Sequence, residues 1–257
     1  MFSIDRSACI SCGRCARACP VGIFRMDETG APQVGREKRC LRCMHCAAAC
    51  PVRAVRAEGV GELYPAPASG GQAALIQARR SIRHFAPQPP DRALIERCIQ
   101  AAAWAPSAKN ARAHRFVVLY GREQADRAGA LALEYARAHR LAPELILSAR
   151  AGRNLVTCGA PCAVLCCARE DGDRGALDSA IALSTLELLL VEAGLGTCWG
   201  GYLARLASMA PALREWLGLE EGWQAYCTLM VGTPEGEDYP NVPPREPVET
   251  RWITENT

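Results

Sequence analysis

Apolar positions beyond residue 71 follow two different periods, so the chain there should contain both helices and strands. Apolar residues recur every three or four positions, as on one face of an α-helix, over 72–80, 91–104, 122–139 and 178–194. Short apolar runs typical of strands cover 116–120, 161–168 and 224–231. Asp91 is the expected N-cap of the second helix, and Gly194 the stop of the fourth. The pattern predicts a mixed α and β domain.

The stretch 180–191 is apolar on nearly every side of a helix. Such a helix must be buried all round, in a domain centre or in a subunit interface. Glu187 and Glu192 interrupt the apolar run 180–195, which argues against a membrane span. No basic start followed by an apolar run lies near Met1, so we expect a soluble, cytoplasmic protein.

Residues 59–71 have no apolar period and are rich in Gly, Pro and Ser, which is typical of a linker. We therefore expect one domain over 1–62, a linker over 63–71 and a larger domain over 72–257. Five prolines from Pro234 to Pro247 forbid regular structure near the C-terminus. This last part is expected to run as an extended arm across another surface.

Cysteines give the first indication of chemistry. Eight of the fifteen fall in two copies of Cys-x2-Cys-x2-Cys-x3-Cys-Pro, namely Cys9, Cys12, Cys15, Cys19 and Cys40, Cys43, Cys46, Cys50. This spacing resembles bacterial ferredoxins with two [4Fe-4S] clusters, in which the fourth cysteine ligates the cluster of the other triplet. One cluster is then assigned Cys9, Cys12, Cys15 and Cys50, and the other Cys40, Cys43, Cys46 and Cys19.

The two copies repeat beyond the cysteines at a period of thirty-one residues, which implies an internal pseudo-twofold axis. Structural zinc and a disulfide framework are the competing interpretations. Zinc needs no third evenly spaced cysteine, and disulfides need an oxidising compartment. Residues 1–60 hold ten Lys or Arg against five Asp or Glu, a surplus that roughly offsets two anionic clusters. These bases do not indicate nucleic-acid binding.

Three segments of the larger domain resemble the nitroreductase family of flavin enzymes. The first is Arg79-Arg80-Ser81-Ile82-Arg83, whose guanidinium and hydroxyl groups suit a phosphate. The resemblance implies that Arg79, Arg80, Ser81 and Arg83 hold the FMN phosphate, together with Arg245 near the C-terminus. A single arginine of this set would be interpreted as a solvated charge; the cluster favours the phosphate.

The second segment, 105–110, carries Pro106, Ser107 and Asn110, and in relatives lies against the flavin ring. Where family members often have Gln-Pro-Trp, this chain has Arg112-Ala113-His114. The third segment, 194–202, resembles the one whose backbone amides face flavin N5 and O4, which implies contacts from Cys198, Trp199, Gly200 and Gly201. Its Gly-rich spacing follows a helix, not a strand, so it is no Rossmann fingerprint.

Cys158, Cys162, Cys166 and Cys167 are interpreted as core packing and not as a third metal site, with Cys162 and Cys166 on one strand face and Cys167 on the other. The four histidines show no metal spacing. The resemblance implies an intertwined homodimer with FMN sites at the subunit interface, and no side chain as an obligatory acid or base.

Together these features predict an α+β protein in which a two-cluster ferredoxin-like domain precedes a nitroreductase-type mixed sheet. Single electrons would enter from an external donor such as ferredoxin, flavodoxin or NAD(P)H. FMN would then reduce a small conjugated acceptor, such as a nitroaromatic or a quinone. Two alternatives stay open: an NAD(P)H-dependent reductase that passes electrons outward through the clusters, and a redox sensor or electron-storage protein.

Overall fold

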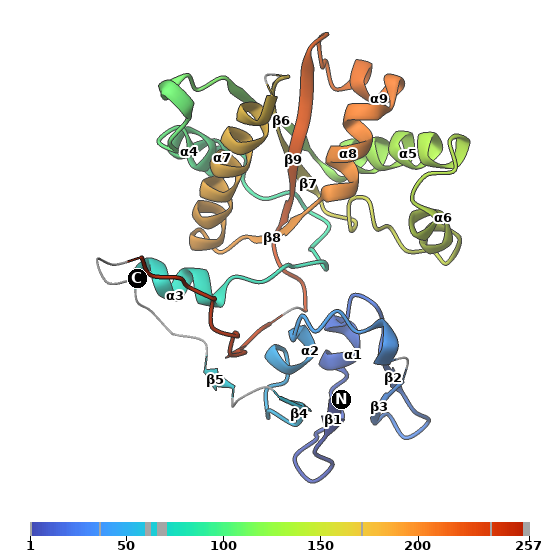
Figure 1. Ribbon diagram of the computed structural model, residues 1–257. Helices are drawn as coiled ribbons and strands as arrows, with labels where there is room; N and C mark the ends of the chain where they lie inside the picture. The colour runs from blue at the N-terminus through green and yellow to red at the C-terminus, as the bar shows by residue number, and fades with distance from the viewer. Residues whose placement is uncertain are drawn as a thin grey trace. The chain divides into compact units, whose positions relative to one another are not determined.

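A computed structural model describes residues 2–35, 37–59, 63–65, 71–170, 172–236 and 238–253. The chain forms two compact units: Met1–Ala78 together with Asp238–Thr257, and Arg79–Glu237 (Figure 1). This grouping places 71–78 and the C-terminal arm with the cysteine-rich segment. The sequence predicts domain limits at 62 and 72. The compact units of the structure are instead divided after Ala78 and again after Glu237.

The larger unit is built on a four-stranded sheet in the order β6-β7-β9-β8. Its strands are β6 (His114–Tyr120), β7 (Cys162–Arg169), β8 (Gly196–Trp199) and β9 (Trp223–Gly232). All pairs are antiparallel, with Val118 opposite Val164 and Val164 opposite Leu229. Seven of the eight β7 residues are buried, because this strand is central and both of its faces are covered.

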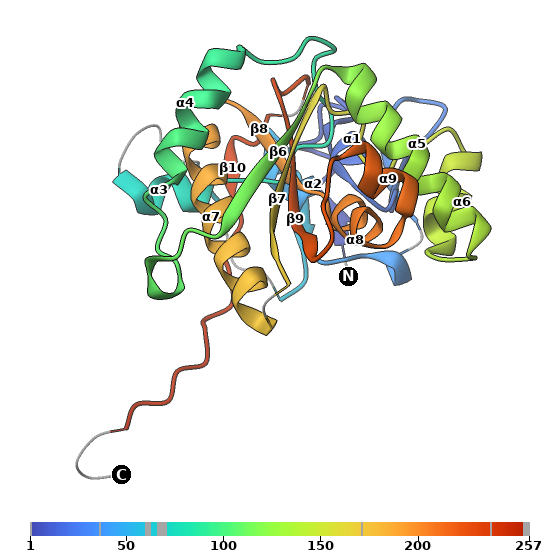
Figure 2. The same ribbon diagram turned by 90° about the horizontal axis from the view of Figure 1, so that it is seen from above.

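Helices cover both faces of this sheet (Figure 2). On one face lie α4 (Arg92–Ala102) and α7 (Gly172–Glu192); on the other lie α5 (Arg122–Ala138), α8 (Gly201–Met209) and α9 (Pro211–Trp216). The remaining helix is α6 (Pro143–Arg150), and η2 (Ala108–Asn110) is a single 3-10 turn. Ile95 of α4, Leu186 of α7 and Leu229 of β9 belong to one buried core between α4, α7 and the sheet.

The predicted helices and strands of this unit are all present, with limits shifted by a few residues. The Asp91 side chain accepts from the Ala93 N–H at 3.0 Å, which confirms the N-cap. Gly194 has φ +82 and ends α7, as expected. The sequence did not predict α6, β8, α8 or α9, which are short or begin in glycine-rich segments. Within the single chain, Ile181 of α7 is 40% exposed, so the domain centre alone does not bury this helix all round; burial of the rest in a subunit interface stays a prediction.

The smaller unit contains two cysteine-rich halves, each with a short helix. Its strands and helices are β1 (Phe2–Ile4), α1 (Arg14–Ala18), β2 (Phe24–Met26), β3 (Pro32–Val34), η1 (Glu37–Arg39), α2 (His45–Ala48), β4 (Val55–Ala57), β5 (Tyr64–Pro65) and α3 (Gly71–Ala78). β1 pairs with β4 and β2 with β3, both antiparallel. Ile23, Phe24 and Val55 pack with the buried cysteines in one core.

The C-terminal arm adds β10 (Asn241–Val242), which pairs antiparallel with β5. Pro243 is also buried, whereas Arg245 and the residues that follow it up to Ile253 are exposed. The arm thus contributes two residues of strand beside β5, and its course as an extended arm across another surface stays a prediction. Among the described helices, none has the length and apolar character that a membrane crossing demands.

Candidate functional site

One cavity of the smaller unit collects thiols from both halves of the repeat. Cys9, Cys12, Cys15 and Cys50 line it together with apolar side chains such as Ile4 and Val55. These are the four cysteines that the spacing assigns to one cluster. Since four thiolates and an apolar wall suit a [4Fe-4S] cluster, the donor set fits this cofactor. Within the described residues, no three His, Cys, Asp or Glu side chains converge on a single metal-ion position.

The other set of cysteines is also gathered. The Cys46 thiol is buried, and its pKa is raised by that burial and by its neighbours Cys19 and Cys43. Burial likewise raises the pKa of Cys15 to about 11, with Cys50 and Cys12 adding to it. Without a metal, the Cys46 and Cys15 thiols would stay protonated at neutral pH. A bound metal centre would stabilise them as thiolates, because it deprotonates its ligands.

Both fourth cysteines accept a hydrogen bond from an equivalent backbone amide. Ile23 N–H donates to Cys19 Sγ at 3.3 Å, and Ala54 N–H donates to Cys50 Sγ at 3.1 Å. Ile23 and Ala54 are thirty-one residues apart, the period of the repeat. The pseudo-symmetry of the sequence is thus present in the geometry around the sulfurs.

Asn241 of the C-terminal arm is buried against the segment that carries Cys50. Its Nδ2 donates to the Cys50 carbonyl at 2.7 Å and to the Ala48 carbonyl at 3.3 Å, and its Oδ1 accepts from Arg53 Nε at 2.9 Å. Beside it, the Tyr239 and His45 rings meet edge to face at 5.4 Å. The arm therefore holds the backbone around one predicted cluster ligand.

In the larger unit, two of the three predicted flavin segments lie side by side. Ser81 forms a parallel bridge with Thr197 of β8, and Ile82 N–H donates to the Thr197 carbonyl at 2.8 Å. Gly196 is required there, because a Cβ at this position would come within 3.0 Å of the Ile82 side chain. The segment expected at the phosphate thus runs beside the segment expected at the flavin ring.

Glu187 connects these two segments from the C-terminal half of α7. Its side chain is only 4% exposed and pairs with Arg79 Nη1 at 2.8 Å. The same carboxylate accepts from Thr197 Oγ1 at 3.1 Å and from the Trp199 indole N–H at 2.9 Å. A buried carboxylate persists only when it is paired and hydrogen-bonded, as this one is. Arg79 is thereby positioned, and its charge is shared with Glu187.

Asp178, two and a half turns earlier on α7, holds the remaining segment. This buried carboxylate accepts from the Ala108 N–H at 3.0 Å, at the start of η2. Within the segment, Ser107 Oγ accepts from the Arg112 N–H at 3.0 Å, and Asn110 Oδ1 accepts from Arg112 Nε at 3.2 Å. The helix α7 therefore anchors all three segments through two buried acids.

Gly200 and Gly201, at the turn from β8 into α8, have different surroundings. A Cβ on Gly200 would collide with the Met230 side chain, and the Gly200 N–H already donates to the Thr228 carbonyl at 2.8 Å. A Cβ on Gly201 would meet nothing within 4 Å. Gly201 begins α8, where the first amides lack an intrahelical acceptor. Of these two glycines, Gly201 has the amide suited to an electron-rich ligand atom.

The other predicted residues are placed as follows. Arg80 Nη1 donates to the Arg79 carbonyl at 2.7 Å, and Arg83 Nη1 to the Ser81 carbonyl at 3.2 Å. Pro106 and Asn110 are exposed, and Cys198 is buried. Arg245 is exposed and belongs to the other compact unit. Contact of each with FMN stays a prediction.

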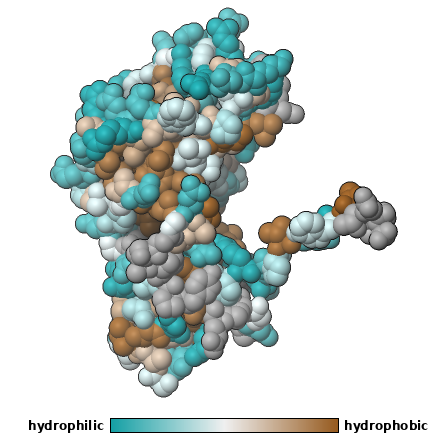
Figure 3. All heavy atoms as spheres, turned by 90° about the vertical axis from the view of Figure 1, so that its left-hand side faces the viewer, coloured by the Kyte–Doolittle hydropathy of each residue, from teal (hydrophilic) through white to brown (hydrophobic). Residues whose placement is uncertain are grey.

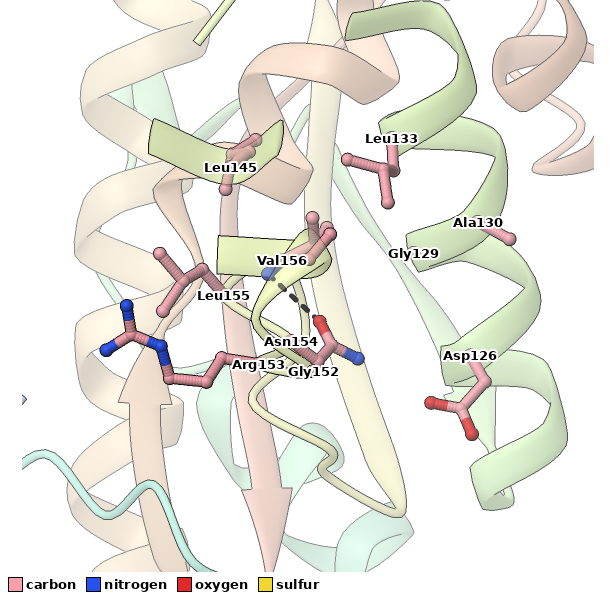
Figure 4. Close-up of a pocket in the computed structure, with 11 residues that line it drawn as sticks. Asp126, Gly129, Ala130, Leu133, Leu145, Gly152, Arg153, Asn154, Leu155 and Val156 are labelled. Atoms are coloured by element: carbon pink, nitrogen blue, oxygen red, sulfur yellow. Dashed lines mark hydrogen bonds between the residues drawn. The ribbon is translucent and has the colours of Figure 1, made fainter. Parts of the chain in front are cut away.

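A separate cavity of about 310 Å³ lies between α5, α6 and the turn that follows α6 (Figure 4). Leu133 and Leu145 form apolar walls, and Arg153 and Asp126 lie at its edge. Asn154 stiffens the turn, since its Oδ1 accepts from the Val156 N–H at 3.0 Å. None of the predicted flavin residues lines this cavity.

The cysteines outside the two four-cysteine motifs are mostly packed in the core. Cys162 and Cys166 belong to the core between α4, α7 and the sheet, as predicted for one strand face. Burial raises the pKa of each of these two thiols to about 12. Such thiols are inert hydrophobes at neutral pH.

The family model described as "Nitroreductase family" matches residues 76–233, so this chain belongs to the nitroreductase family. A second model, described as a "4Fe-4S dicluster domain", matches residues 1–51 and indicates two [4Fe-4S] clusters. Together the matches define an oxidoreductase with an N-terminal iron-sulfur domain.

Solved structures support the same fold for the larger part. An FMN-bound nitroreductase from Desulfitobacterium hafniense matches with a TM-score of 0.61 and 23% identity over 71% of this chain and 97% of that chain. An FMN-bound nitroreductase from Bacteroides fragilis gives 0.57 and 17% over 72% and 95%. A nitroreductase-like family protein from Bacillus cereus gives 0.53 and 23% over 74% and 98%.

Sequence reasoning missed the anchoring roles of Glu187, Asp178 and Asn241. In the sequence, Glu187 is evident only as a charge that interrupts an apolar helix. That interruption was itself the available indication, because a carboxylate in an otherwise apolar helix must find a buried partner. Asn241 offered no comparable pattern, since its partners are backbone carbonyls.

Proposed function

We propose that the protein is an FMN-dependent oxidoreductase in which single electrons pass through two [4Fe-4S] clusters to the flavin. Bound FMN would supply the conversion between one-electron and two-electron chemistry, and the substrate that is reduced would be a small conjugated acceptor. The observation that carries this proposal is the convergence of three separated segments on two buried acids of α7, in a chain whose other unit brings four thiols to one cavity.

The residues divide the work in this proposal. Arg80, Ser81 and Arg83, with Arg245, would bind the phosphate, because guanidinium groups and a hydroxyl suit that anion. The amide of Gly201 and the segment 198–200 would lie along the flavin edge. The ion pair with Glu187 partly neutralises Arg79, which weakens its attraction for a phosphate, so we assign Arg79 chiefly to positioning. The exposed ring of Trp199, held by Glu187, would flank a planar acceptor.

A homodimer is part of the proposal, with FMN bound at the interface between subunits. The apolar side chains of Leu177 and Ile181 on α7 are exposed, and so is Trp104 at the end of α4, at 86%. Figure 3 shows apolar side chains gathered in patches on one face among hydrophilic ones. Exposed apolar patches of this kind are typical of protein interfaces.

Cofactor content tests the proposal first. Protein purified without oxygen should contain about eight irons per chain, from two four-iron clusters, and one FMN. Turnover of a quinone or a nitroaromatic should then require both cofactors. A yellow protein without iron would remove the iron-sulfur half, and a holoprotein that turns over no such acceptor would favour a sensor.

A further inference from the structure

Two cysteine loops of the smaller unit, the first over 7–13 and the second over 38–44, have similar backbone conformations but differ in charge. Ser11 and Arg42, which are repeat equivalents, have φ +54 and +50, and Gly13 and Met44 have φ +71 and +62. The loops also share an exposed apolar residue next to the first cysteine, Ile10 at 60% and Leu41 at 63% exposure. Both loops therefore adopt the same conformation, as expected if each binds a cluster in the same way.

Charge is present on only one of them. The second loop carries Lys38, Arg39 and Arg42, all exposed, where the first carries Ser7, Ala8 and Ser11. Within the described part of the chain, no ion pair is recorded for these three cations. The first loop has the same cysteine spacing but none of these three charges, so cluster ligation does not require them.

We infer that the second loop is the docking surface for the electron donor, and that the donor is a small acidic one-electron carrier protein. This inference rests on the proposed function. Leu41 would be the apolar centre of the contact, and Lys38, Arg39 and Arg42 its charged rim. Complementary charge at a rim mainly accelerates encounter and selects the partner.

The position of the loop suits this role. Arg42 lies between Cys40 and Cys43, and its own N–H donates to Cys40 Sγ at 3.3 Å. A partner that covers Leu41 and Arg42 would therefore sit directly over predicted ligands of the second cluster. One electron would leave the reduced carrier and enter that cluster, with no proton transferred and no bond broken.

The repeat also supplies the test variant. Lys38→Ser, Arg39→Ala and Arg42→Ser together give the second loop the residues of the first, which that backbone already accommodates. A matched control removes three exposed arginines outside both loops: Arg25→Ala, Arg92→Ala and Arg97→Ala. Iron content and the cluster absorption of both variants should equal those of the unchanged protein.

The experiment measures anaerobic reduction of each holoprotein by an acidic bacterial two-cluster ferredoxin, reduced beforehand. At low salt the loop variant should react at least about tenfold more slowly than the control, because steering by three cations is lost. The difference should vanish near 1 M salt, where the Debye length is about 3 Å. Reduced methyl viologen, a small cation that needs no docking surface, should reduce all three proteins at similar rates.

Other outcomes are equally clear. Equal rates for the loop variant and the control with ferredoxin would overturn the docking surface while leaving the proposed function intact, provided that methyl viologen still reduces clusters and flavin. If methyl viologen reduces the clusters but no electron reaches the flavin, the proposed function itself fails. If only NAD(P)H reduces the protein, and equally in every variant, an acidic protein donor is excluded.

Discussion

The two units of this protein hold their predicted cofactors by different means. In the smaller unit the ligands are set by spacing along the chain, with three cysteines of each set inside seven consecutive residues. In the larger unit the site is assembled from segments that begin at residues 79, 105 and 194, and two buried acids of one helix hold them together. Local spacing specifies the first kind of site, and tertiary hydrogen bonds specify the second.

Removing one ligand should have the largest effect. Cys50→Ser takes the fourth thiolate from the cluster of Cys9, Cys12 and Cys15, so iron should fall from about eight to about four or fewer per chain. The FMN content should be unchanged, because all of the proposed flavin residues except Arg245 belong to the other unit. Iron and flavin analysis of the anaerobic protein measures both.

Cys98→Ser is the matched control, since this thiol packs in the larger core and is assigned to no cluster. It should keep all of its iron. A loss of FMN in Cys50→Ser as large as the loss of iron would contradict the independence of the two sites.

Glu187→Gln should have the next largest effect. The substitution leaves Arg79 without its counterion and weakens the bonds to Thr197 and Trp199. Breaking a fully buried pair costs about 3–5 kcal/mol, and since Arg79 is 38% exposed we expect about 2–3 kcal/mol of unfolding free energy. Denaturant unfolding of the FMN-free protein measures it.

Glu192→Gln lies on the same helix but at an exposed position, and should change stability by less than about 0.5 kcal/mol. If both variants unfold at the same denaturant concentration, Glu187 is not the anchor that we describe.

Asn241→Ala tests whether the smaller unit depends on a distant segment as well as on local spacing. It removes the bonds to the Cys50 and Ala48 carbonyls and leaves buried groups unpaired, at a cost of about 1–3 kcal/mol. Iron should be released faster on exposure to a chelator. Val248→Ala, at an exposed position of the same arm, should release iron at the unchanged rate.

Gly200→Ala and Gly201→Ala should have smaller effects, and on different properties: the first on stability and the second on FMN affinity. Alanine at 200 must displace the Met230 side chain, which costs about 1–2 kcal/mol even without FMN. Alanine at 201 has open space, so it should leave the FMN-free protein unchanged and lower only its affinity for FMN. Unfolding and flavin titration separate the two; equal FMN affinity in Gly201→Ala and the unchanged protein would remove Gly201 from the flavin site.

The sequence was most informative where information is local. The spacing of cysteines, the Asp91 cap and the Gly194 stop each depend on a few neighbouring residues, and the structure has them as expected. The strand β8 and the helix α8 were missed because they are short and their glycines are poor indicators of either element. Glu187 could be identified as unusual, but its partners lie on other elements and follow only from the fold.

Electron flow from the clusters to the flavin is the central claim, and anaerobic stopped-flow reduction tests it most directly. The holoprotein would be mixed with reduced ferredoxin, flavodoxin or NAD(P)H while the cluster and flavin absorption bands are followed separately. We predict that a protein carrier bleaches the cluster bands first and the flavin band afterwards, and that Cys50→Ser slows only the flavin step. Rapid bleaching of the flavin by NAD(P)H, at the same rate in Cys50→Ser, would contradict the account.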